Sequence, residues 1–129
     1  MKTKIRIHTP STGWVHAELD SDKNPESVKN ILASLPITGS TQLWGDEIYF
    51  SIPLKMGEEN SQVEVAVGDL AYWPPGTSFC IFFGRTPASR GEKPAAASAV
   101  NVFGRILEDP TVFRSVKNGE KISIELIDD

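Results

Sequence analysis

Hydrophobic and polar residues alternate in short runs along most of this chain, which is the pattern of strands that bury one face. Turn-forming residues separate the runs, and residues 10–13 join the first two into a predicted hairpin. Six of these runs predict strands, at residues 5–7, 15–19, 43–52, 63–67, 100–106 and 122–126. Residues 68–84 are treated separately below.

Two segments predict helices instead. Asn24 as the N-cap and Pro25 in the first turn begin the longer one, and Pro36 ends it. Residues 109–119 repeat the start with Asp-Pro, end with Asn-Gly and predict a short second helix. The longer helix carries an apolar stripe that must pack on a sheet, formed by Val28, Ile31, Leu32 and Leu35.

Residues 68–84 form the most apolar and aromatic stretch of the sequence. The double proline at Pro74 and Pro75 predicts a rigid corner between two buried strands. Both faces of the second strand are apolar, so one face is expected in the interior and the other against a helix or a pocket. Tyr72 and Trp73 must point to opposite faces, which makes one of them a candidate exposed aromatic on a binding surface.

Strands outnumber helices, and no alternation of strand, helix and strand appears. We therefore expect a mainly β protein, a closed antiparallel barrel of about eight strands with one or two helices capping its ends. The length of 129 residues predicts a single domain over 1–129. Residues 85–99 are expected to be the longest loop, and a loop of that length is usually functional or mobile.

Composition narrows the function classes. The net charge of −4 and the lack of a basic cluster argue against a nucleic-acid partner. No apolar run is long enough for a membrane span, and the first residues do not form a signal peptide, so a cytoplasmic location is expected. The single cysteine, Cys80, excludes an intrachain disulfide and is expected to be a small buried hydrophobe.

Several short motifs, in their order along the chain, resemble those of the cyclophilins. They are the helix at 27–35 with Thr38-Gly39, Ile52-Pro53, Gly68-Asp69-Leu70-Ala71, Ser78-Phe79-Cys80-Ile81-Phe82, Val102-Phe103-Gly104-Arg105-Ile106 and the final strand from Lys121. Residues 44–50 together with 68–76 are more closely similar to a small prokaryotic branch that has a minimal cyclophilin-like barrel and no well-established activity. The resemblance implies a cyclophilin-like barrel over most of the chain.

The departures from cyclophilins bear on chemistry. Where the resemblance would place the catalytic arginine, ahead of Ile52-Pro53, this chain has Ile48, Tyr49 and Phe50. His8 and His16 both lie in the predicted first hairpin, so the pocket histidine is also missing. Peptidyl-prolyl isomerisation needs a hydrogen-bond donor that weakens amide resonance, and Arg85 or Tyr49 is the candidate for a rearranged site.

The preferred hypothesis is a module that binds a small apolar molecule or peptide in an aromatic pocket. The first alternative is a peptidyl-prolyl isomerase with a rearranged site. The second alternative is an assembly domain that forms a homodimer. No metal or cofactor is expected, since Asp46 and Glu47 have no partner at ligand spacing, although a carboxylate there could accept a ligand N–H. The candidate ligand-binding residues are Trp44, Glu47, Tyr49, Tyr72, Trp73, Phe79, Phe82 and Arg85.

Overall fold

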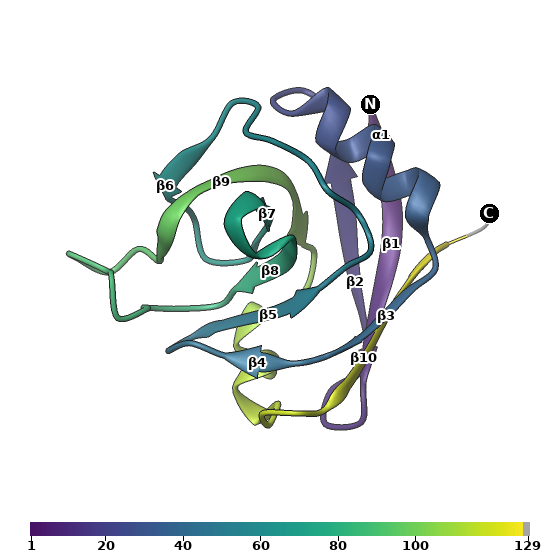
Figure 1. Ribbon diagram of the computed structural model, residues 1–129. Coiled ribbons are helices and arrows are strands. Elements are labelled where there is room, and N and C mark those ends of the chain that lie inside the picture. Colours follow the sequence, from purple (N-terminus) through teal and green to yellow (C-terminus); the bar gives the residue numbers. More distant parts are fainter. Residues whose placement is uncertain (128–129) are drawn as a thin grey trace.

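The computed structural model describes residues 1–127, so the last two residues of the predicted domain lie outside it. One curled antiparallel sheet, ordered β3-β10-β1-β2-β9-β7-β8-β5-β4, makes up most of the described chain, and β6 pairs with β9 beside it (Figure 1). The strands are β1 (Lys2–Thr9), β2 (Gly13–Asp20), β3 (Ile37–Ser40), β4 (Gln42–Leu43), β5 (Glu47–Ser51), β6 (Gln62–Glu64), β7 (Asp69–Trp73), β8 (Ser78–Phe82), β9 (Ala95–Ile106) and β10 (Lys121–Leu126).

Three helical segments accompany the sheet. The α-helix α1 (Pro25–Ser34) buries Val28 and Ile31, as its apolar stripe predicts. The 3₁₀ helix η1 (Pro74–Gly76) forms the expected proline corner between two buried strands. The 3₁₀ helix η2 (Pro110–Ser115) is the expected short second helix, with Asp109 as its cap, and it ends before Asn118. In Figure 1, α1 lies at the top beside β1 and β2, and η2 lies at the bottom, so the two cover opposite ends of the curled sheet. The described part of the chain contains no helix long and apolar enough to cross a membrane.

The main core fills the concave side of the sheet. Its centre is aromatic: the ring of Phe79 stacks on Phe50 at 5.3 Å and meets the edge of Phe103 at 5.1 Å. Such offset and edge contacts stabilise a core beyond the area that they bury. The aliphatic side chains of β1 and β10 complete this cluster, which confirms the alternation expected for both strands.

The predicted mainly β class is confirmed, with ten strands in the described residues in place of about eight. The two additional strands are short: β3 has four residues that were not expected to form a strand, and the two-residue β4 is separated from β5 by a tight turn. The terminal strands of the sheet order, β3 and β4, are joined by Thr41 alone. A Cβ on Gly39 would approach Cδ2 of Phe50 to 2.6 Å, so β3 packs closely on β5. Closure of the sheet into a barrel stays a prediction.

Two expectations about local structure were wrong. Residues 95–99 belong to β9 and not to a loop, because they pair with β6. The strand expected at 63–67 ends at Glu64, since the chain turns where Asp69 N donates to Ala66 O at 3.1 Å. Val65 is therefore buried while Val63 and Val67 are about half exposed.

The start of α1 also differs from its expected cap. The Asn24 side chain makes no capping hydrogen bond. Its amide donates to Val102 O at 2.7 Å instead. The carboxylate of Glu59, from a distant loop, accepts from the backbone N–H groups of Glu26 and Ser27, both at 3.1 Å. Glu59 thus satisfies donors that a helix start leaves free, and these hydrogen bonds hold its loop against the helix.

Candidate functional site

A two-residue turn between β4 and β5 places two candidate residues side by side. Trp44 and Glu47 exchange backbone hydrogen bonds of 2.9 and 3.2 Å across Gly45 and Asp46. Gly45 has φ +61°, and a Cβ there would lie 2.8 Å from Pro87 Cδ, so the turn requires glycine and packs on the following loop. Asp46 N donates to Arg85 O at 2.8 Å, which fixes the turn to the end of β8.

The outer face of β5, β8 and β7 forms the floor of the site. Tyr49 pairs with Cys80, and Cys80 pairs with Ala71, so these three side chains point to the same face, away from the main core. Phe82, on the same face, is fully buried with Cys80 in a second apolar cluster. The expectation that the two faces of β8 serve different surroundings is therefore confirmed, as is the burial of Cys80.

The first half of β9 forms the opposite wall. Ala96, Ala97 and Val100 come from this segment, and their small side chains leave space beside the aromatic rings. The indole N–H of Trp73 donates to Ser98 Oγ at 2.7 Å, which joins the wall to the end of β7. The wall of the site is thus a strand held by a side-chain hydrogen bond.

Together these elements enclose a pocket of about 110 Å³, or about 400 Å³ with its open mouth. A single water molecule needs roughly 10–15 Å³ on the first of these measures, so the pocket has room for a small organic molecule. Its lining is more apolar than polar, as is usual for small-molecule sites. The lining residues are Trp44, Glu47, Tyr49, Trp73, Ala96, Ala97 and Val100.

Glu47 is the only ionisable carboxyl in that lining, and it is only 6% exposed. Burial raises the pKa of Glu47 from 4.5 to about 7, and the nearby Cys80 thiol, as a hydrogen-bond donor, lowers it in part. Burial, with the Glu47 charge adding to it, raises the pKa of the Cys80 thiol well above its usual range. The pocket therefore holds a carboxyl group that changes charge near neutral pH beside a thiol that stays neutral.

The structure brings together four of the eight predicted ligand-binding residues, Trp44, Glu47, Tyr49 and Trp73. Phe82 lies beneath them in the second cluster. The other three lie elsewhere: Tyr72 and Phe79 are fully buried in the main core, and Arg85 is exposed outside the pocket lining.

Of the two neighbouring aromatics, Trp73 is the partly exposed one. Tyr72 is buried because its hydroxyl group donates to Leu54 O at 2.8 Å and accepts from Met56 N at 3.0 Å. Sequence reasoning missed the wall residues Ala96, Ala97 and Val100 as site residues. The alternation from Val100 onward indicates a strand, but the alanine-rich run before it has no such alternation.

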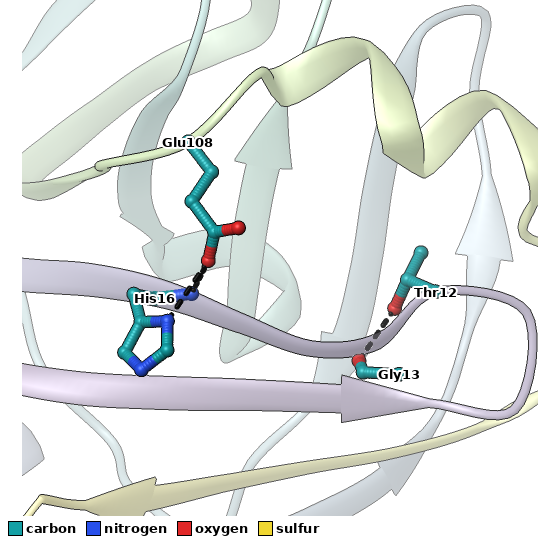
Figure 2. A network of polar contacts seen from close by, with 4 residues as sticks. All are labelled: Thr12, Gly13, His16 and Glu108. Atoms are coloured by element: carbon teal, nitrogen blue, oxygen red, sulfur yellow. Dashed lines mark hydrogen bonds and ion pairs between the residues drawn. The ribbon is translucent and has the colours of Figure 1, made fainter.

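Neither histidine lies in the pocket lining. His8 pairs with Trp14 in the first hairpin, as expected, and their rings are 4.9 Å apart. Figure 2 shows His16 on β2, where its backbone N–H and Nδ1 lie 2.6 and 2.9 Å from Oε2 of Glu108. These hydrogen bonds lower the pKa of Glu108. Both histidines thus contribute to the surface of the hairpin and not to the pocket.

Fold and pocket together define a small, mainly β protein with an aromatic pocket on the outer face of its sheet. The sequence profile of a family described as cyclophilin-like matches residues 3–125. The chain belongs to this cyclophilin-like family.

Solved structures agree with this assignment. A hypothetical protein from Archaeoglobus fulgidus is 40% identical, over 98% of this chain and 95% of that one, with a TM-score of 0.80. McbB in complex with tryptophan is 14% identical, over 97% of this chain and 45% of McbB, with a TM-score of 0.73. A cyclophilin type peptidyl-prolyl cis-trans isomerase from Cryptosporidium parvum is 19% identical, over 100% and 99% of the two chains, with a TM-score of 0.61.

The likenesses to McbB and to the isomerase show the fold alone, because both identities are low. A comparison with curated proteins gave no match.

Proposed function

We propose that this chain is a binding protein whose pocket holds a small, largely apolar ligand or a side chain of a peptide. One observation carries the proposal: three aromatic side chains and one buried carboxyl converge on a single open pocket. A few directional polar groups in a mainly apolar concavity are what small-molecule sites usually present.

The polar edges of the aromatic rings support the same proposal. Within residues 1–127, neither the Tyr49 hydroxyl nor the Trp44 indole N–H takes part in a hydrogen bond. The indole N–H of Trp73, in contrast, is used internally by Ser98. Tyr49 and Trp44 therefore offer directional contacts to a ligand without breaking an internal one.

A weakly active peptidyl-prolyl isomerase is the second candidate, and the position of Tyr49 favours it. Its hydroxyl group, at the pocket, is a donor for the nitrogen of a twisted prolyl amide. Arg85, the other candidate donor, is exposed and is not in the pocket lining. If this candidate is correct, the protein accelerates prolyl isomerisation in a protease-coupled assay on a proline peptide. Tyr49→Phe is then expected to remove the acceleration, and Arg85→Ala to leave it unchanged.

The binding proposal is tested with three probes of similar size, namely benzylamine, benzyl alcohol and benzoate. Amide and indole NMR signals of the chain are followed during titration. At least one probe is expected to give saturable shifts at Trp44, Trp73 and the first half of β9, where the pocket lies. Ala97→Leu, which enlarges a side chain of the lining, is expected to abolish these shifts.

The matched control is Ala88→Leu, which adds the same atoms at an exposed position outside the pocket lining. This variant is expected to bind like the unchanged protein. Shifts scattered over the surface, or none with any probe, would overturn the proposed function.

A further inference from the structure

The carboxyl of Glu47 has no cationic partner within the described residues. All the ion pairs of these residues involve other acidic groups. The neighbouring Asp46, for example, forms an ion pair with Arg114, with 3.7 Å between Oδ2 and a guanidinium nitrogen. A buried carboxylate without a partner is costly, and a positive charge placed beside it offsets that cost. The pocket thus favours a positive charge beside Glu47, in addition to apolar groups against the rest of its lining.

The groups that face Glu47 leave this preference unchanged. From β8 it meets Phe82 and Cys80, and from its own strand Tyr49. The thiol carries no charge there, because burial raises its pKa. The wall of β9 contributes only alanine and valine side chains, and β7 contributes Trp73. No basic side chain belongs to the described lining, so a ligand must supply the positive charge.

The aromatic rings add a second, independent preference. Trp44, Tyr49 and Trp73 line the same volume as the carboxyl. The face of an aromatic ring carries negative electrostatic potential, so it attracts an ammonium group, most strongly where water is excluded. An anionic ligand would be repelled by both the carboxylate and these ring faces, and a neutral ligand would lack the attraction of a full positive charge to either.

We propose that the pocket selects a small organic cation, a protonated amine on an apolar body, with Glu47 accepting its N–H groups and the aromatic rings enclosing it. This inference rests on the proposed binding function and names the class of ligand.

The three probes above separate the two proposals when their dissociation constants are compared at pH ~8.5, where Glu47 is ionised. Benzylamine is expected to bind at least about tenfold more tightly than benzyl alcohol, and benzoate more weakly than either. Glu47→Gln is expected to reduce the preference for benzylamine over benzyl alcohol to about twofold or less while benzyl alcohol still binds. At pH ~5.5, where Glu47 is protonated and the amine remains charged, the same preference is expected to shrink.

Glu64→Gln is the matched control, because Glu64 is exposed on β6 and outside the pocket lining, and it should keep the preference for the amine. Equal or tighter binding of benzyl alcohol or benzoate would overturn the cation inference and leave the proposed function standing. A preference for the amine that survives Glu47→Gln would also overturn it. Binding of no probe would overturn both proposals.

Discussion

Replacing Glu47 by glutamine tests whether its burial sets the acid–base behaviour of the pocket. The change keeps the shape of the side chain and removes the ionisation. In the folded protein the pKa of this carboxyl is about 7, against its ordinary value of 4.5, which applies to the unfolded chain. A raised pKa means that the folded state binds the proton more tightly than the unfolded state does.

The sign of the effect follows from this difference. The stabilisation from the protonated carboxyl is fully present below pH ~4.5 and is lost as the pH rises to about 7, above which the loss no longer grows. At about 1.4 kcal/mol for each pKa unit, the whole loss is about 3 kcal/mol. Because Glu47 is nearly inaccessible to water, solvent screening reduces this figure little.

Urea unfolding of the unchanged protein and of Glu47→Gln at about pH 4 and about pH 8 gives the required comparison. The free-energy advantage of the glutamine variant is expected to be about 3 kcal/mol larger at the higher pH. Other groups with shifted pKa values, such as Asp69 and Glu108, titrate in both proteins and cancel in this difference. Glu64→Gln, at an exposed position, should show no such change.

Parallel pH profiles, with the two proteins differing by a constant within about 0.5 kcal/mol, would refute the reasoning. Such a result would mean that the carboxyl is already hydrated in the folded state. The opposite slope would mean that an internal cation holds Glu47 in its charged form.

Three further substitutions test how the surrounding fold is held. Asn101→Ala is expected to cost about 2–4 kcal/mol in urea unfolding, because it removes the three hydrogen bonds of a buried side chain, to Glu59 N, Ser27 Oγ and Gly57 O. Glu59→Ala removes the side chain that caps α1 and should cost about 1 kcal/mol, with a matching loss of helix signal on warming. Gly104→Ala would bring a Cβ to 2.3 Å from the Glu18 carbonyl oxygen, so a melting temperature within ~2 °C of the unchanged protein would contradict the close packing of β2 on β9.

Much of the sheet was predictable because most strands bury one face and expose the other. The alternation around Ile5 and Ile7, both fully buried, is a direct example of this pattern. Residues 95–99 were not predicted as a strand because four of the five are alanine, which is depleted in strands. Their strand exists only through pairing with β6, and pairing at a distance leaves no local signal.

The site was predictable in part for a similar reason. Alternation showed that Tyr72 and Trp73 point apart, but it did not say which one is buried. The two backbone partners of the Tyr72 hydroxyl, at Leu54 and Met56, decide this, and they come from a separate segment. The same limit applies to Glu47, which lines one pocket with the wall that β9 forms, although the two segments are far apart in the sequence.

That wall has a consequence for which molecules the pocket can accept. The second half of β9 lies in the main sheet between β2 and β7, so the strand cannot swing away like a loop. A ligand slightly too large would have to break ladder bonds between β6 and β9 or the contact of Trp73 with Ser98. Each such bond contributes about 1 kcal/mol, so ligands that grow towards the wall should lose about fivefold in affinity for each bond broken, while ligands that grow towards the open mouth should not.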